Sequence, residues 1–326
     1  MPSIRRILVA VKDTGARSMP AVQKAAQLAR ALKAKLELYH AISDPVYVDA
    51  LAIAGQSVAQ LQRQWKTAHL KKLERVADRL RAEGTLVTTA VDWDFPAFEA
   101  VLRRATRIKA DLIVAERHAS RHVAPWLLRF NDWELLRRSR VPVLLVKSGQ
   151  AYDKPVVLAA IDPSHSFAKP AKLDSAILEA GKTLATALQG TLHAAHAFVP
   201  STIDVDKLDV NLPNLSAYIE AEAAKHAQGA IDKALKDSGL SPAQRHLVGR
   251  HAVDAIPALA RELKTSIVVM GAVSRTGIKR LLIGNTAERI LDALACDVLV
   301  LKPSTFATRA PRGKRGVQFI ATPMAI

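Results

Sequence analysis

The chain has 326 residues, of which 49% are hydrophobic and 24% are charged, and its 47 Lys and Arg against 30 Asp and Glu give a net charge of +17. This length predicts two domains with ordinary buried cores, and no apolar run approaches the roughly 18 residues that a membrane span needs. The composition therefore excludes a membrane-spanning protein, and the short apolar stretch at the N-terminus favours a cytoplasmic protein over a secreted one.

The first half alternates short apolar runs with helical patterns. Continuous runs rich in Val, Ile and Leu at 7–11, 36–42, 111–115 and 140–147 are typical of parallel strands that helices cover on both faces. Apolar residues at helical spacing predict helices over 20–33 and 58–82. The acidic residues near these strand ends could hold Mg²⁺ or perform acid–base chemistry. We interpret Asp132 as a helix cap. The other acidic residues, Asp92, Asp94 and Glu116, are interpreted as solvated.

Residues 148–155 are interpreted as a linker, and the second half repeats the pattern of the first. Apolar runs recur at 157–161, 191–198, 266–270 and 295–302, and helical patterns recur at 173–188 and 216–236. Strands that alternate with helices imply right-handed βαβ units and an open, doubly wound sheet. The single cysteine, Cys296, cannot form an internal disulfide and is interpreted as a small buried apolar residue.

Four strand-like runs of the first half match runs of the second half in the same order. DLIVA (111–115) matches SIVVM (266–270), and RVPVLLVK (140–147) matches ACDVLVLK (295–302), both at a shift of 155. His40 and His196 fall on equivalent positions, which favours a repeated structural role. The chain is therefore predicted to be a tandem duplication of one α/β domain, with domains at 1–148 and 149–305 and a tail at 306–326.

The loops that follow the first and fourth strands of each copy are the expected ligand sites, because open α/β sheets bind ligands at the carboxyl ends of strands where the strand order reverses. In the second copy the first of these strands ends at Asp162. The other runs into a loop with glycines at 271, 277 and 284, and a helix is expected to start near 285. Exposed backbone N–H groups in such a loop form an anion site.

The segment GAVSRTGIKRLLIGNTAERI resembles the universal stress protein signature, in which glycines and a final Ser or Thr wrap the phosphates of ATP. Gly271 and Gly284 match the pattern, whereas Ser274 replaces the second glycine and Asn285 replaces the final hydroxyl residue. The stretches 96–105, 132–147 and 274–303 are similar to the E-type tandem members. The resemblance covers the chain up to about residue 305 and implies two Rossmann-like domains of the adenine nucleotide alpha hydrolase-like group.

The resemblance also implies a nucleotide site in the second domain. Asp162 takes the position that contacts the ribose or adenine, and Ala197 takes the position that faces the adenine. The phosphates would be held by Gly271, Gly284, Asn285 and Thr286, with Ser274 in the loop and cations at Arg275, Lys279 and Arg280. ATP is the expected ligand of this domain, with Mg²⁺ as its companion ion. No residue is assigned a catalytic role or a metal-ligand role of its own.

The first domain departs from the same pattern. At the shift of 155, Glu116 replaces Gly271, and Lys12 stands at the end of the first strand in place of Asp162. The remaining loop positions hold Ala119, Arg129 and Phe130. A carboxylate at Glu116 would repel phosphate where the loop needs bare backbone, so we expect no ATP in the first domain.

By resemblance, the chain is expected to act in stress survival, including resistance to DNA damage, rather than in a metabolic reaction. The family also implies that the last strands, 143–147 and 298–302, pair the domains into an internal pseudo-dimer, as a monomer or within a homodimer. Two alternatives stay open. The chain could be a slow ATPase or nucleotidyl-transfer enzyme, or a binding protein for a ligand other than a nucleotide.

The tail carries a basic cluster, Arg309, Arg312, Lys314 and Arg315, beside Pro and Gly. A short segment of this kind is expected to be disordered, with weak affinity for phosphate. The net charge of +17 predicts nonspecific contact with polyanions, and the alternative is that this charge mainly confers solubility.

Overall fold

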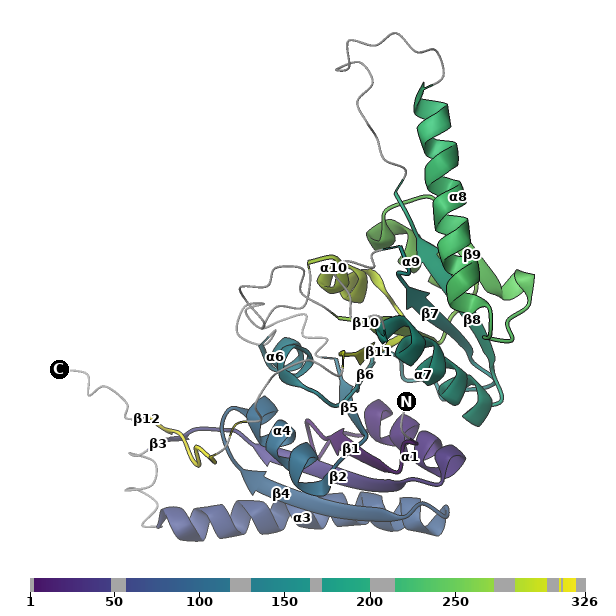
Figure 1. Cartoon of the computed structure of the whole chain (residues 1–326). Helices are drawn as coiled ribbons and strands as arrows, with labels where there is room; N and C mark the ends of the chain where they lie inside the picture. The colour runs from purple at the N-terminus through teal and green to yellow at the C-terminus, as the bar shows by residue number, and fades with distance from the viewer. Residues whose placement is uncertain are drawn as a thin grey trace, which may run out of the picture. The chain divides into compact units, whose positions relative to one another are not determined.

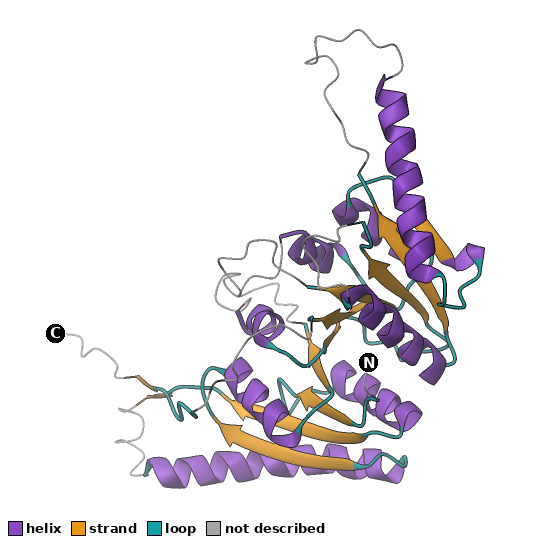
Figure 2. Ribbon diagram, in the orientation of Figure 1, coloured by secondary structure: helices purple, strands orange, loops and turns teal. Residues whose placement is uncertain are grey.

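The computed structural model describes residues 3–47, 57–117, 130–164, 172–199, 215–272, 285–303, 311 and 313–320. The chain divides into two compact units (Figure 1). The N-terminal unit comprises Pro2–Ala151 together with Ala307–Ile326, and the C-terminal unit comprises Tyr152–Phe306. Both units alternate strands with helices (Figure 2), as the sequence predicts for an α/β fold. Among the helices of these described residues, none is long and apolar enough to cross a membrane.

The N-terminal unit contains a parallel sheet in the order β4-β2-β1-β5-β6. Its strands are β1 (Arg6–Ala10), β2 (Lys35–Ile42), β4 (Val87–Trp93), β5 (Leu112–Glu116) and β6 (Val143–Val146), with a short β3 (Val46–Tyr47) outside this sheet. Its helices are α1 (Pro20–Leu32), α3 (Val58–Ala82), α4 (Ala97–Ile108) and α6 (Phe130–Arg138).

The C-terminal unit repeats this arrangement, with parallel strands in the order β11-β10-β7-β8-β9. Its strands are β7 (Val156–Ile161), β8 (Thr191–Ala197), β9 (Arg245–Val248), β10 (Ile267–Gly271) and β11 (Asp297–Leu301). Its helices are α7 (Leu173–Ala187), α8 (Leu215–Leu235), α9 (Ala252–Glu262) and α10 (Asn285–Ala293), with a 3₁₀ turn at Pro242–Gln244.

The apolar runs of the sequence form the buried centre of each sheet. In β1 the side chains of Ile7, Leu8 and Val9 have no exposed surface, and Val268 and Val269 of β10 are equally buried. Such continuous burial requires cover on both faces of the sheet, which the alternating helices supply. The prediction of tandem Rossmann-like domains with open parallel sheets is therefore confirmed for each unit.

The duplication extends to unusual backbone conformations. Lys109 ends α4 with φ of 53°, and Lys264, its equivalent at the shift of 155, follows α9 with φ of 50°. Lys33 after α1 and Gln189 after α7 share the same left-handed conformation. A left-handed residue commonly ends a helix because its N–H can reach the last free carbonyls. The two copies thus end matching helices in the same way, although neither uses glycine there.

Residues 313–320 of the tail pack against the N-terminal unit, whereas the sequence predicted a disordered segment. These residues belong to the N-terminal unit, where β12 (Phe319–Ile320) pairs in parallel with β3. The Lys314 ammonium lies 2.6 Å from Asp92 Oδ1, and Arg315 Nη2 donates to Glu99 Oε1 at 2.9 Å. Local sequence patterns do not predict this order, because the partners of the tail lie more than 200 residues away along the chain.

Candidate functional site

In the C-terminal unit, the strand order reverses between β7 and β10. The chain adds β8 and β9 on one side of β7, then crosses to place β10 on the other side. Side chains at the carboxyl ends of β7 and β10 therefore flank the position where open α/β sheets bind ligands.

The strand register brings three of the predicted site residues to this edge. Ile161 pairs with His196, so Asp162, which follows β7, and Ala197, the last residue of β8, lie side by side. Met270 pairs with Ala160, which places Gly271 beside Ile161. Asp162, Ala197 and Gly271 thus share one edge of three adjacent strands.

Helix α7 holds the backbone at Asp162. The Asp162 N–H donates to Asp174 Oδ1 at 3.1 Å, and Asp174 lies in the first turn of α7. A carboxylate at that position also interacts favourably with the helix dipole. The Asp162 side chain keeps 30% of its surface exposed, with Oδ1 lying 3.9 Å from His196 Nδ1. Its oxygens can therefore accept hydrogen bonds from a ligand at this edge.

Gly271 has a packing role besides any role in ligand binding. A Cβ atom at this position would lie 2.8 Å from Leu173 Cδ2 and 3.3 Å from Ile177 Cδ1, both on α7. Glycine at the end of β10 thus lets α7 pack closely against the strand.

Two further predicted residues, Asn285 and Thr286, lie at the start of α10. They are its first two residues, and the Thr286 side chain is exposed. The first N–H groups of a helix have no partner within the helix and can bind anions. Ser274 and Gly284 lie outside the described residues, as do the loop cations Arg275, Lys279 and Arg280.

The equivalent edge of the N-terminal unit is lined differently. Lys12 and Glu116 line a cavity of about 50 Å³ together with Met19 and Ala21 at the start of α1. This volume holds one or two water molecules. Phe130 starts α6, whereas Ala119 and Arg129 lie outside the described residues.

Sequence reasoning missed a hydroxyl group that recurs in both units. It lies two residues after Lys12 in the N-terminal unit and two residues after Asp162 in the C-terminal unit. In the C-terminal unit, Ser164 Oγ lies 2.8 Å from Nε2 of the fully buried His196. In the N-terminal unit, Thr14 Oγ1 instead lies 2.7 Å from Nδ1 of His69, which α3 supplies. The repeat of a hydroxyl at Thr14 and Ser164 is visible in the sequence and could have been noticed.

His69 stacks on His40, with ring centroids 4.6 Å apart, and His40 Nδ1 lies 2.8 Å from the Val11 carbonyl oxygen. A second pair, His193 and His246 on β8 and β9, has ring nitrogens 2.9 Å apart. Burial lowers the pKa of all four side chains below the usual value. The charge of the neighbouring ring lowers the pKa of His69 and His246 further. All four are therefore neutral in the folded chain near pH 7.

We expect the free energy of unfolding to fall as the pH is lowered from about 7.5 to 5. Unfolding restores an ordinary histidine pKa of about 6.5, so the unfolded chain binds more protons below that pH. The stabilisation by the neutral pairs is thus present above pH 6.5 and is lost as the pH falls toward the lowered values. Urea unfolding at several pH values measures the slope, which His193→Asn with His246→Asn should reduce. His226→Asn on the exposed face of α8 is the control, and an equal slope in all three chains would contradict the prediction.

The interpretation of Asp92 and Asp94 as solvated side chains is wrong. Asp94 is only 1% exposed and pairs with Arg103, and Asp92 accepts a hydrogen bond from the Tyr39 hydroxyl at 3.3 Å. Burial acts to raise the pKa of Asp92, but the hydrogen bond and charge of Lys314 outweigh it and leave the pKa lowered. Contacts with Tyr39 and Arg103, together with those of Lys314 and Arg315 in the tail, account for the difference. The Asp132 side chain is outside those that the structure describes, so its interpretation as a helix cap stays a prediction.

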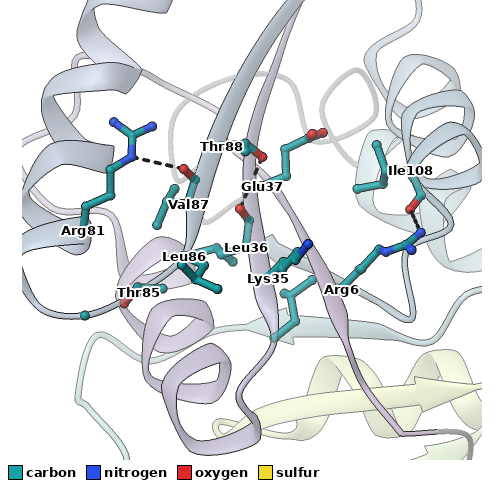
Figure 3. A pocket seen from close by; sticks show the side chains of 12 residues that line it. Arg6, Lys35, Leu36, Glu37, Arg81, Thr85, Leu86, Val87, Thr88 and Ile108 are labelled. Carbon is teal, nitrogen blue, oxygen red and sulfur yellow. Dashed lines mark hydrogen bonds between the residues drawn. The ribbon is translucent and has the colours of Figure 1, made fainter.

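A pocket of about 750 Å³ opens at the amino ends of β1, β2 and β4 (Figure 3). Arg6 Nη1 donates to the Ile108 carbonyl at 2.8 Å, and Arg81 Nε donates to the Val87 carbonyl at 3.1 Å. These guanidinium groups are thus engaged with the backbone. The pocket lies at the edge of the sheet opposite to the one where α/β folds bind ligands.

Comparison with known proteins agrees with this geometry. The sequence matches the universal stress protein family twice, over residues 3–147 and 156–302. The chain is 26% identical to universal stress protein E of Escherichia coli K12 over 309 residues, which cover 92% of this chain and 95% of the relative. It is 24% identical to the universal stress protein E homologue of Haemophilus influenzae, with 83% and 88% covered. A solved structure of a protein of unknown function from Pseudomonas aeruginosa PAO1 is 27% identical, with a TM-score of 0.70 and 93% and 94% covered. The duplicated fold and the two matches show that this chain belongs to the universal stress protein family, as a tandem member of the E type.

Proposed function

We propose that the C-terminal unit binds an adenine nucleotide at the carboxyl edge of its sheet. The supporting observation is the convergence of Asp162, Ala197 and Gly271 beside the point where the strand order reverses. The exposed part of the Asp162 carboxylate is a suitable acceptor for ribose hydroxyls. Phosphates would be held by the N-terminus of α10 and by the loop that precedes it, including Ser274, Gly284, Asn285 and Thr286.

Mg²⁺, when bound with ATP, would neutralise part of the phosphate charge. The N-terminal unit would not take part in nucleotide binding, because Glu116 and Lys12 occupy the matching positions and the Glu116 carboxylate would repel phosphate. We propose that nucleotide binding in this chain serves survival under stress in the cytoplasm, including resistance to DNA damage. The protein would act as a nucleotide-dependent sensor rather than as a metabolic enzyme.

Equilibrium binding of labelled ATP to the full chain tests this proposal. Asp162→Ala is expected to weaken binding about tenfold, which is the loss of one or two ligand hydrogen bonds. Gly284→Glu is expected to weaken binding at least as much, because a carboxylate would repel the phosphates. Lys12→Ala, at the equivalent position of the N-terminal unit, is the matched control and should leave the affinity unchanged.

The outcomes separate the alternatives. No binding at millimolar ATP would overturn the nucleotide site and favour an interaction protein. Loss of binding in Lys12→Ala but not in Asp162→Ala would move the site to the N-terminal unit. Phosphate release at rates of order one per second or faster would instead favour an enzyme.

A further inference from the structure

The tail binds a group of carboxylates at the carboxyl end of β4. Asp94 follows this strand, and Glu99 lies in the first turn of α4. The side chains of Asp94 and Glu99 are 1% and 5% exposed, and that of Asp92 is 16% exposed. Carboxylates buried to this extent need several hydrogen-bond partners to offset the loss of water.

Each of the three carboxylates divides its oxygens between its own unit and the tail. Asp92 Oδ2 accepts from Tyr39 while its Oδ1 faces Lys314 at 2.6 Å. Glu99 Oε2 accepts from Arg103 at 3.4 Å while its Oε1 accepts from Arg315 at 2.9 Å. Asp94 Oδ2 pairs with Arg103, and its Oδ1 faces the tail. One oxygen of each carboxylate thus contacts Tyr39 or Arg103, and the other contacts the tail. Glu99 Oε1 also lies 3.9 Å from Arg138 Nη1 of α6.

Backbone groups of the tail make the contact specific. The N–H groups of Arg315 and Gly316 both donate to Asp94 Oδ1, at 2.9 and 3.2 Å. Two successive N–H groups converge on one oxygen in the concave backbone conformation that binds anions. Gly316 has φ of 74°, a conformation that residues with a side chain rarely adopt. This recognition depends on the conformation of the peptide and is not a simple attraction of opposite charges.

The tail continues from the carboxylates onto an apolar surface. Val317 packs against a cluster formed by Ile42, Val46 and Trp93. The Val46 N–H donates to the Gln318 carbonyl at 2.8 Å, and β12 pairs with β3 beyond it. The surface that receives the tail therefore has a carboxylate part, an apolar part and a strand edge, which together we call the tail groove. It is formed by Asp92, Asp94, Glu99, Ile42, Trp93 and β3.

We propose that the tail groove is a binding site for a basic, strand-forming peptide, and that residues 313–320 of this chain are its occupant. This site lies at the carboxyl ends of β2 and β4, away from the reversal of strand order between β1 and β5. The three carboxylates favour cationic side chains and repel phosphate, whereas the strand edge binds any extended backbone. The segment Gly-Lys-Arg-Gly-Val-Gln-Phe-Ile matches all three parts of the groove in order.

Hydrogen–deuterium exchange of the full chain tests whether the tail occupies the groove. The amides of 315–320 should exchange slowly in the native chain. Lys314→Glu with Arg315→Glu should accelerate their exchange at least about tenfold, because two carboxylates then face the carboxylates of the groove. Lys236→Glu, an exposed lysine just beyond α8, is the matched control and should have no effect. Exchange that is equally fast in all three chains would overturn the proposal.

Peptide binding in trans tests the specificity of the groove. The probe is a labelled synthetic peptide of residues 313–320, and the receptor is the full chain with Lys314→Glu and Arg315→Glu, whose own tail is released. The peptide should bind at least about tenfold more tightly than a scrambled peptide of the same composition. A peptide with Gly316→Ala should bind about fivefold more weakly, because alanine resists the positive φ.

Equal binding of the native and scrambled peptides would reduce the groove to a nonspecific charge effect and overturn the proposal. Absence of binding by either peptide would overturn it as well. Asp94→Asn with Glu99→Gln in the receptor should abolish the preference for the native sequence, with circular dichroism as the check on folding. ATP affinity is expected to stay unchanged in all these chains, so this test and that of the nucleotide site fail independently.

Discussion

Glu37→Leu is expected to lower the free energy of unfolding of the N-terminal unit by about 3 kcal/mol. Arg104 Nε and Nη2 donate to the two carboxylate oxygens of Glu37 at 2.6 and 2.9 Å. Only 11% of the Glu37 side chain and 13% of the Arg104 side chain are exposed. Removal of the carboxylate would leave a mostly buried guanidinium without its main partner. Contacts of Arg104 with Asp92 and the Tyr39 ring keep the loss near the lower end of the usual range.

Chemical unfolding followed by circular dichroism measures this loss, and a double replacement controls it. Glu37→Leu with Arg104→Met removes both charges and keeps most of the apolar volume, so it should recover more than half of the lost free energy. If the double variant is as unstable as the sum of the two single variants, the ion pair is not the cause.

Gly190→Ala is expected to lower the free energy of unfolding of the C-terminal unit by about 2 to 3 kcal/mol. A Cβ atom on Gly190 would lie 2.0 Å from the Pro155 carbonyl oxygen and 2.9 Å from its carbonyl carbon. The same carbonyl accepts the hydrogen bond from the Thr191 N–H at 3.0 Å, which joins the start of β8 to the residue before β7. A flexible side chain could move away from the methyl group, but this backbone cannot do so without loss of that bond.

The same substitution at Gly229 is the matched control. Gly229 lies in the interior of α8 with no atom within 4 Å of the added methyl group. Alanine there should stabilise the chain by up to about 1 kcal/mol, because it favours the helix. Thermal unfolding of the two variants should therefore shift in opposite directions, and a stable Gly190→Ala chain would contradict the close approach at Pro155.

The elements that could be predicted from the sequence are those whose buried positions produce a clear pattern of apolar residues. The predicted helix over 58–82 is α3 itself, and each predicted apolar run overlaps a strand of its sheet. The edge strands β4 and β9 were missed. In β4 only Val87 and Trp93 are buried, and β9 has just four half-buried residues. A strand covered on one side only mixes polar and apolar residues and lacks the continuous apolar run on which the prediction depended.

The candidate site was predictable to the extent that parallel strands bring their carboxyl ends together. Asp162, Ala197 and Gly271 end three strands, so topology alone places them side by side. The contact between Thr14 and His69 could not be predicted in this way. It depends on where α3 lies over the sheet, which helical periodicity does not specify. The burial of Asp94 also depends on long-range packing, in this case on a segment that local composition marks as disordered.

The placement of the tail has a consequence for the synthesis of the chain. Lys314 and Asp92 are 222 residues apart, so the ribosome must make the whole C-terminal unit before the N-terminal unit can receive its last segment. Until then β3 presents an unpaired edge, and the carboxylates beside it face water. At 5–20 residues per second, synthesis from Ala151 to Lys314 takes roughly 8 to 33 seconds. A nascent N-terminal unit is therefore open to capture by other basic segments during this interval, and the edge closes only once residues 313–320 have been made.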